Sequence, residues 1–414
     1  MKKFKIDLTT SIVIAMVLGM IAGYLFPQFM IDTKFIGDVF LRLIQMSIVV
    51  LVMGAVIEAV GSLKISELGR LGGKTLAGFM VTTLFASYVG IVIANVLEPG
   101  KHIAASSEAL DQVVKTVETP SVSKMITDFF PSNIVGSLAS GNTIQVIIFS
   151  ILFGVALATF VEQTGDESIL NFVKNINQIL LNLVKMVIKV APIGIFSLLG
   201  WTVATYGYEV IKPLLSFLFI LIAACVLLSL FFIFITAAVT RLNPFRLISK
   251  LMRTMMVALT TTSSAVTLPV EMEDCETKIG ISKRVNRLVM PLGMSMNSNG
   301  TALYLAMASI TIAQFFGYEM PMVTQFKVVI MSTLAVLGTI VVPGGGLVAL
   351  AIVLPTIGLP LEGIALLAGI DWFAGAFRTL LNVVTDVTVG VWVAATEGEL
   401  NRDIFNSDVP VVQE

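Results

Sequence analysis

The stretch "GAFRTLLNVVTD" (residues 375–386) carries an arginine, an asparagine and an aspartate inside a long apolar segment. Polar or glycine positions recur here at intervals of four, three, four and four residues: Asp371, Gly375, Arg378, Asn382 and Asp386. At about 100° per residue, this spacing places them on one narrow stripe of a helix whose other faces are apolar. A charged side chain at the bilayer centre costs about 2.5–3.5 kcal/mol. The stripe is therefore predicted to face protein, water or a ligand rather than lipid.

The overall composition is that of an integral membrane protein. Of 414 residues, 56% are hydrophobic and 13% are charged, and the mean hydropathy is +0.95. An ordinary globular domain has about twice that share of charged residues. The net charge of −1 provides no basic field for a nucleic acid. Membrane lipid is the predicted surrounding, and nucleic acid is excluded as a partner.

Few residues of the chain suggest enzymatic chemistry. The lone histidine, His102, has no partner for a nucleophilic or zinc site, and the surroundings of Cys225 and Cys275 are too different to predict a disulfide. The segment "GRLGGKT" (69–75) lacks the spacing of a phosphate loop, so we interpret it as a turn between helices. The sequence therefore predicts neither an enzyme nor an organic cofactor.

Six apolar stretches before residue 241 are long enough to cross about 30 Å of hydrocarbon. They lie at about residues 8–28, 36–61, 75–97, 142–161, 170–200 and 212–240. Lys2, Lys3 and Lys5 place the N-terminus in the cytoplasm by the positive-inside rule. We interpret the first stretch as a retained helix. The polar loop at 98–140 is then extracellular, and no motif indicates its role.

The chain changes character after residue 243. Apolar pieces too short to span a membrane are joined by the tips "TTSSAV" (261–266) and "PGGG" (343–346). Non-helical backbone at membrane depth persists only where protein buries it or where it lines a wet cavity. We therefore interpret both segments as re-entrant hairpins whose tips line a cavity. Ordinary loops at the membrane surface are the alternative.

Each predicted hairpin is followed by a helix interrupted by polar residues, at 293–304 and at 375–386. The plan of hairpin and broken helix thus occurs twice, and one full span between the copies gives them opposite orientations. Inverted repeats of this kind are typical of secondary transporters, whose substrate and ion sites lie near the membrane midplane.

The two ends of the polar stripe suggest different ligands. A guanidinium at Arg378, aimed into a cavity with glycine tips around it, suits a bidentate clamp on a carboxylate. The alternative is a buried ion pair with Asp371 that holds helices together. Asp386 lies two turns beyond Arg378, and carboxylate, amide and unwound carbonyl oxygens suit a small hard cation. Asn297 and the backbone around Gly293 could complete such a site.

Four motifs together resemble those of the dicarboxylate/amino acid:cation symporter family, which includes archaeal aspartate transporters and the excitatory amino acid transporters. They are "TTSSAVTLP" (261–269), "NSNGT" (297–301), "VPGGG" (342–346) and "RTLLNVVTD" (378–386). The resemblance covers nearly the whole chain. It implies an all-α integral membrane protein with eight transmembrane helices, two re-entrant helical hairpins, inverted repeats and an elevator-type mechanism.

The resemblance also implies a homotrimer with a division of labour along the chain. Residues 1–240 would form six transmembrane helices, of which the first, second, fourth and fifth are a static trimerisation scaffold, while the third and sixth belong to the moving transport domain. Residues 241–398 would form the transport core, and residues 399–414 a cytoplasmic tail.

The same resemblance implies a substrate site and two sodium sites. The implied substrate-binding residues are Ser263, Ser264, Thr301, Val342, Gly345, Gly346, Arg378 and Asn382. Arg378 would bind the side-chain carboxylate of the substrate, and the Val342 backbone would contact its ammonium. The implied sodium ligands are Gly293, Asn297, Asn382 and Asp386 in one site, and Ser295, Ser298, Val336, Leu337 and Thr339 in the second.

Two departures from the family pattern change these expectations. Asn299 replaces an aspartate of a third sodium site, and Phe79 replaces a tyrosine beside Thr82 and Thr83. We therefore expect fewer coupled sodium ions, or partial replacement of sodium by protons. Gly375 replaces the acid that receives the substrate ammonium in aspartate transporters, which would cost an amino group about 1–3 kcal/mol. This change favours succinate, fumarate or malate without excluding glutamate or aspartate.

The combined prediction is a secondary active symporter that couples uptake of a small anionic dicarboxylate or acidic amino acid to entry of Na⁺, H⁺ or both. The alternatives are a neutral amino acid:Na⁺ symporter of the same family and an anion-conducting channel. A channel would need a continuous polar lining over several helices, whereas the polar residues here concentrate in two helices and two tips. The expected location is the cell inner (plasma) membrane, with both termini in the cytoplasm.

Overall fold

The structure, a computed structural model, describes residues 8–62, 65–101, 127, 130–208, 211–337, 345–368, 370–407 and 409. These residues form helices and connecting turns, and their only β pairing is an isolated bridge between Ile281 and Leu400. The elements are α1 (Leu8–Leu25), α2 (Pro27–Asp32), α3 (Lys34–Gly61), α4 (Ile65–Leu97), α7 (Ile134–Ser140), α8 (Thr143–Thr164), α9 (Ser168–Lys189), α10 (Ala191–Tyr206), α11 (Ile211–Thr240), α12 (Pro244–Thr261), α13 (Ser264–Asp274), the π-helical turn η2 (Cys275–Ile279), α14 (Lys283–Met296), α15 (Asn299–Phe315), α16 (Met322–Leu337), α17 (Gly345–Thr356), α18 (Gly363–Ala368), α19 (Asp371–Glu397) and α20 (Arg402–Asn406).

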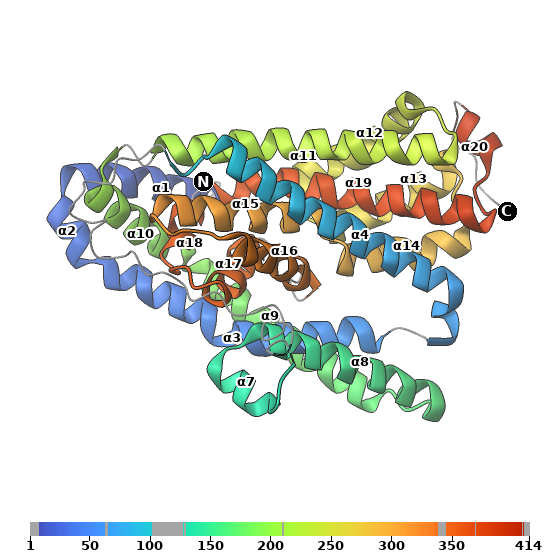
Figure 1. Ribbon diagram of the computed structural model, residues 1–414, viewed down its shortest axis with the longest axis horizontal. Helices are drawn as coiled ribbons and strands as arrows, with labels where there is room; N and C mark the ends of the chain where they lie inside the picture. The colour runs from blue at the N-terminus through green and yellow to red at the C-terminus, as the bar shows by residue number, and fades with distance from the viewer. Residues whose placement is uncertain are drawn as a thin grey trace, which may run out of the picture.

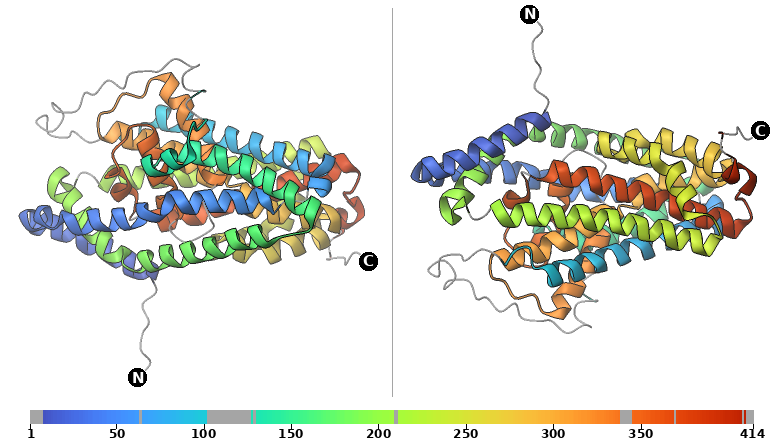
Figure 2. Two further views of the ribbon diagram at one scale, coloured as in Figure 1. Left: turned by 90° about the horizontal axis from the view of Figure 1, so that it is seen from below. Right: turned by 90° about the horizontal axis from the view of Figure 1, so that it is seen from above.

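The long helices pack in two groups (Figure 1). The first helix group consists of α1, α2, α3, α8, α9 and α10, in which α10 packs along α1 and α3, and α3 packs against α8 and α9. The second helix group consists of α4 and α11 to α17 together with α19, which contacts α11, α12, α14 and α15. In Figure 1, α16 and α17 lie between α15 and the first group. Figure 2 shows α11 and α19 side by side along the long axis.

Several helices have the length and composition of membrane spans. Within the described residues, four are long and apolar enough: Arg70–Leu97, Gln145–Thr164, Ile211–Thr240 and Phe373–Glu397. The helix α11 is apolar all round, with Phe217 and Leu221 buried and Phe219 and Leu227 largely exposed. A helix of this kind suits one face on protein and the other on lipid. The span at Phe373–Glu397 differs, because most of it is buried inside the protein.

The first predicted hairpin appears as two helices that pack on each other. Thr262 ends α12 in the left-handed conformation with φ 51°, and the side chain of Ser263 accepts a hydrogen bond from the Val266 backbone to cap α13. The arms α12 and α13 contact one another directly. The arms of the second predicted hairpin are α16 and α17, which also pack together, while its tip at 338–344 lies outside the described residues.

The helix following the first hairpin is broken where the sequence predicted. Asn297 ends α14 with φ −111° and ψ 88°, and Ser298 precedes α15 with φ −115° and ψ 61°. The Asn297 amide still donates to the Gly293 carbonyl at 2.8 Å. Unwound backbone therefore lies between two helices of the second group, facing α19.

Three sequence-based expectations were wrong. The stretch 170–200 is two helices, because the chain turns at Val190 and Pro192, which lacks a backbone N–H, sits in the first turn of α10. The segment 69–75 is not a turn but lies within α4, where consecutive glycines are tolerated inside a longer helix. The last helix is not broken, since α19 runs without interruption over 27 residues.

Candidate functional site

The polar stripe of α19 is buried in the second helix group. Asp371 is 4% exposed, Arg378 6%, Asn382 8% and Asp386 0%. Because α19 packs against most of the helices of its own group, the stripe faces protein rather than lipid, as the cost of charge in hydrocarbon requires. The polar atoms on this stripe are therefore available to one another and to anything that enters the group.

Arg378 occupies the centre of a small cluster near the start of α19. Its Nη2 forms an ion pair with Asp371 Oδ1 at 2.9 Å, so the ion pair that the sequence left open does form, inside one helix. The guanidinium also lies over the ring of Tyr304 from α15, 4.3 Å from the ring centre. Among the described residues, Arg378 Nη1 has no hydrogen-bond partner. One edge of the guanidinium is thus unsatisfied in a buried place.

Two glycines set the space around that guanidinium. A Cβ placed on Gly346, in the first turn of α17, would lie 1.7 Å from Arg378 Nη1 and 2.5 Å from Asp371 Oδ1. The second hairpin therefore approaches the ion pair more closely than a side chain allows. A Cβ on Gly375 would meet only Arg378 Nη2, at 3.3 Å. Position 375 is thus adjacent to the guanidinium, and it carries no side chain.

Asp386 lies at the break in the helix pair α14–α15. Its Oδ1 accepts a hydrogen bond from Asn297 Nδ2 at 2.7 Å. A Cβ on Gly293 would lie 2.5 Å from the same oxygen, so the α14 backbone runs directly against the carboxylate. Asp386 Oδ2 has no hydrogen-bond partner among the described residues. The structure thus brings together three of the four predicted ligands of the first sodium site.

The fourth predicted ligand, Asn382, fixes the other side of the break. Its Oδ1 accepts a hydrogen bond from the Gly300 backbone at 2.7 Å. A Cβ on Gly300 would lie 2.3 Å from the Arg378 carbonyl oxygen, so only glycine fits between α15 and α19. Thr301 follows directly on α15. This contact places the first turn of α15 between the Arg378 and Asp386 regions of the stripe.

The region of the third family sodium site is neutral and internally bonded here. Thr83 Oγ1 donates to Asn299 Oδ1 at 2.6 Å and to Asn297 Oδ1 at 3.4 Å. Thr82 Oγ1 reaches the same Asn297 oxygen at 3.5 Å. Phe79, one turn earlier on α4, is buried in the apolar core. The Asn299 carbonyl oxygen therefore accepts from a hydroxyl where the resemblance implies a carboxylate, while Asn299 Nδ2 has no hydrogen-bond partner among the described residues.

The remaining predicted site residues are less closely assembled. The Ser295 hydroxyl donates to the Pro291 and Leu292 carbonyls, whereas Val336 and Leu337 end α16, which packs against both α14 and α15. In the described chain, Ser263 and Ser264 form no hydrogen bond or ion pair with α19, although α13 packs against it. Gly345 starts α17. Val342, Gly344 and Thr339 lie outside the described residues.

The sequence interpretation missed two buried residues of this region. Tyr304 follows the "NGT" motif by one helical turn, so its spacing from Thr301 could have placed its ring on the same face. Glu271 is a carboxylate in the hairpin arm α13, and it is fully buried. A charge in a predicted membrane segment was a sufficient signal for its selection.

A buried arginine and a buried aspartate beside unwound backbone in a helical membrane protein define an ion-coupled carrier of small anions. Comparison with known proteins agrees: the family model described as "Sodium:dicarboxylate symporter family" matches residues 8–396. The chain belongs to this family, so it is a multi-pass membrane transporter and not an enzyme.

Two relatives are similar to it over nearly their full lengths. A proton/sodium-glutamate symport protein of Geobacillus stearothermophilus is 33% identical over 413 residues, which covers 96% of each chain. A protein of the same description from Bacillus caldotenax is also 33% identical over 413 residues, with the same coverage.

Proposed function

We propose that the protein is a secondary active symporter that takes up a small dicarboxylate together with Na⁺, in the cell inner membrane. The observation that carries this proposal is the buried Arg378, whose Nη1 is unsatisfied and lies against the glycine turn at Gly346. A planar guanidinium in a desolvated site binds carboxylates through paired hydrogen bonds. A substrate carboxylate would accept a hydrogen bond from Arg378 Nη1 and compete with Asp371 for Arg378 Nη2.

The preferred substrate is a C4-dicarboxylate such as succinate, fumarate or malate. An α-amino group would need an acceptor near the guanidinium, and position 375 offers none because it is glycine. Asp371, the carboxylate paired with Arg378, is already engaged by that cation. The relatives are described as glutamate symporters, so acidic amino acids are the second substrate class, and the experiment below separates the two.

The coupling cation is proposed to bind at Asp386. The carboxylate has one unpartnered oxygen, it is fully buried, and it lies against the α14 backbone near the break. Oxygen ligands from an amide, a carboxylate and unwound carbonyls suit Na⁺. Gly293, Asn297 and Asn382 would complete this site, and Ser295, Ser298, Val336, Leu337 and Thr339 would form a second one.

The proposed mechanism is an elevator movement within a homotrimer. The first helix group would be the trimeric scaffold, and the second group would carry the substrate across the membrane. An apolar cavity of about 370 Å³ between α3 and α8 on one side and α4, α14 and α16 on the other supports this division. Apolar side chains line most of it, so few directional bonds would resist sliding there. Both termini are proposed to face the cytoplasm.

The test is uptake of radiolabelled succinate and aspartate into proteoliposomes, with sodium and pH gradients imposed separately. Succinate uptake that requires the sodium gradient and exceeds aspartate uptake would support the proposal. Gly375→Asp should shift the preference towards aspartate, because it restores an acid beside the guanidinium. Gly375→Ala is the matched control, since it fills the same space without a charge.

Each contrary outcome removes a different part of the proposal. Faster aspartate uptake by the unmodified protein would refute the assignment of Gly375. Uptake driven only by the pH gradient would refute the sodium site at Asp386. Substrate-independent anion current without accumulation would favour a channel instead.

A further inference from the structure

Glu271 is a buried carboxylate that the proposed sites do not use. It lies in the hairpin arm α13 and is 0% exposed. Neither Oε1 nor Oε2 has a hydrogen-bond partner among the described residues. An ionised carboxylate without partners in a dry interior is strongly disfavoured. Something must therefore neutralise Glu271 while α13 stays packed in the second helix group.

The charged groups around α13 do not supply that neutralisation. The carboxylate that acts on Glu271 electrostatically is Asp386, from α19, and Glu271 in turn acts on the buried thiol of Cys275 in η2. No hydrogen bond or ion pair joins Glu271 to Asp386 in the described chain. The other charged groups on α12, α13, η2 and α14 have partners other than Glu271, or they are at least partly exposed. Arg253 pairs with Glu273 and Asp274, Lys278 pairs with Asp274, and Arg284 pairs with Glu399. Glu276 accepts a hydrogen bond from Asn286, Arg246 and Lys250 donate to carbonyls near the C-terminus, Lys283 is part-exposed and Arg287 is exposed.

Two buried carboxylates that act on each other are not both ionised without cations. A sodium ion at Asp386 would balance one negative charge and leave the other. A metal ion at Glu271 would need several further oxygen ligands. No described hydroxyl bonds to Glu271, since Thr254 donates to Asp274 and Thr267 donates to the Ser263 carbonyl. Leu268 and Met272, on the same arm, pack in the apolar core. A proton needs only the carboxylate itself.

We propose that Glu271 is the proton-binding residue of the transport cycle, neutral while α13 is packed against α19, and that Asp386 is kept for sodium. The Glu271 carboxylate would take one proton from the side on which substrate enters and release it on the other side, so that its O–H bond forms and breaks once per cycle. The inference rests on the proposed symport function.

The test is luminal pH in proteoliposomes that contain a pH-sensitive dye, during succinate uptake driven by a sodium gradient. The unmodified protein should acidify the lumen in step with uptake. Glu271→Gln should abolish this acidification, retain sodium-driven uptake and make uptake independent of external pH. The matched control is Glu273→Gln, because Glu273 lies on the same arm, is half-exposed and is paired with Arg253. This control should behave like the unmodified protein.

A second measurement keeps the inference testable if Glu271→Gln transports nothing. Raising the pH from about 6 to about 8 should lower the melting temperature of the unmodified protein, because the buried carboxylate must then lose its proton or expose itself. With saturating sodium present to balance the charge of Asp386, Glu271→Gln should remove that dependence, and Glu273→Gln should not.

The outcomes separate the inference from the proposed function. Equal acidification by the unmodified protein and by Glu271→Gln would overturn the inference. Loss of sodium dependence with retained acidification would also overturn it and make Glu271 a sodium ligand. If the unmodified protein takes up substrate on a sodium gradient without any acidification, the symport function stands and the proton role fails. If it takes up neither succinate nor aspartate on any gradient, the proposed function itself fails.

Discussion

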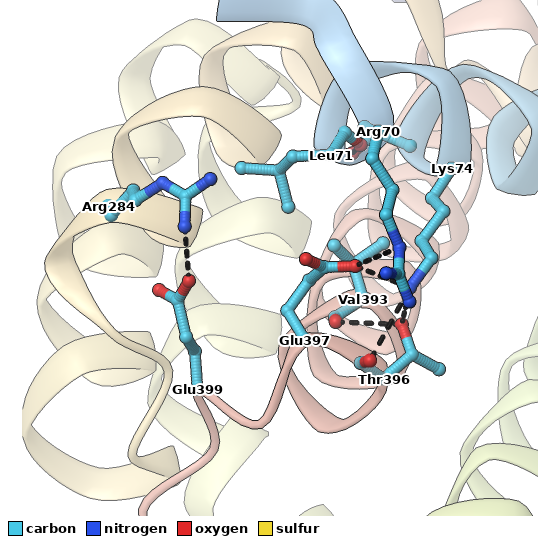
Figure 3. A network of polar contacts seen from close by, with 9 residues as sticks. Arg70, Leu71, Lys74, Arg284, Val393, Thr396, Glu397 and Glu399 are labelled. Carbon is cyan, nitrogen blue, oxygen red and sulfur yellow. Dashed lines mark hydrogen bonds and ion pairs between the residues drawn. The ribbon is translucent and has the colours of Figure 1, made fainter.

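The middle and the end of α19 use charge in opposite ways. In the middle, Arg378 and Asp386 are buried and each keeps an unpartnered polar atom. At the end, Glu397 is paired with both Arg70 and Lys74 of α4, as Figure 3 shows. Glu399, just beyond, pairs with Arg284 of α14 at 2.6 Å. The end of the helix is saturated with partners, whereas the middle is not.

This difference separates groups that hold the protein together from groups kept for a ligand. A surface ion pair contributes about 0–1 kcal/mol, because water and salt screen it. An unsatisfied buried group costs about 1–3 kcal/mol or more, so it persists only where something offsets that cost in the working cycle. The middle of α19 should therefore be sensitive in transport assays, and its end chiefly in stability assays.

The largest effect is expected at Arg378. Arg378→Lys keeps the positive charge but removes the planar fork, and breaking one partner of a buried charge pair costs about 2–5 kcal/mol. We expect uptake at limiting substrate to fall at least about thirtyfold by that measure. Radiolabelled succinate uptake measures this, and Arg70→Lys at the end of the helix is the control. Equal losses in the two variants would erase the distinction between the two regions.

Asp386 should show a loss of coupling rather than of folding. Asp386→Asn keeps the shape and, with its Oδ1 towards Asn297 Nδ2, the hydrogen bond to Asn297, but it removes the charge that a cation needs. We expect the dependence of substrate binding on sodium concentration to become shallower, because only the second proposed sodium site remains. Isothermal titration of succinate at several sodium concentrations measures this, with Glu397→Gln as the matched loss of a carboxylate on the same helix. Unchanged sodium dependence would place the ion elsewhere.

A smaller effect is expected at Tyr304, whose ring lies under the guanidinium. Tyr304→Leu removes a cation–π contact of about 0.5–2 kcal/mol and should weaken substrate binding about two- to thirtyfold. Tyr304→Phe keeps the ring and should stay close to the unmodified protein. The comparison of succinate dissociation constants for the two variants gives the answer. If Phe and Leu are equally damaging, the ring face is not what positions Arg378.

The helix α19 illustrates what the sequence could and could not predict. The stripe on α19 and the break at Asn297 follow from periodicity and from polar residues in apolar surroundings, and both appear in the structure. The ion pair with Asp371 was an open alternative, because spacing alone does not decide which way an arginine turns. The polar residues at 375–386 and the repeated plan of hairpin and broken helix predicted a break in α19, whereas α19 is continuous and its polar residues are accommodated by packing against neighbouring helices.

Other features depend on contacts between distant segments. Gly346 in the second hairpin lies against Arg378 of α19, although the two residues are more than thirty positions apart in the sequence. No local sequence pattern predicts that contact. The turn at Val190 lies inside the largely apolar stretch "MVIKVAPIGIF" (186–196), where Pro192 was the residue that marked it. Glu271 was visible as a charge in a predicted hairpin arm, but its lack of partners depends on how α12, α14 and α19 pack around α13.

The smallest effect is expected at Glu397, where the charges are already satisfied. Glu397→Gln removes the carboxylate that Arg70 and Lys74 share, but Arg70 is 75% exposed and Lys74 keeps a hydrogen bond to Thr396 at 3.1 Å. We expect a small loss of stability, seen as a slightly lower melting temperature. The difference in melting temperature should vanish at high salt, because salt screens the pair. Succinate uptake should be unchanged. A transport defect in Glu397→Gln that salt does not remove would mean that the link between α4 and α19 takes part in the transport cycle. The end of α19 would then have a role in transport, as its middle does.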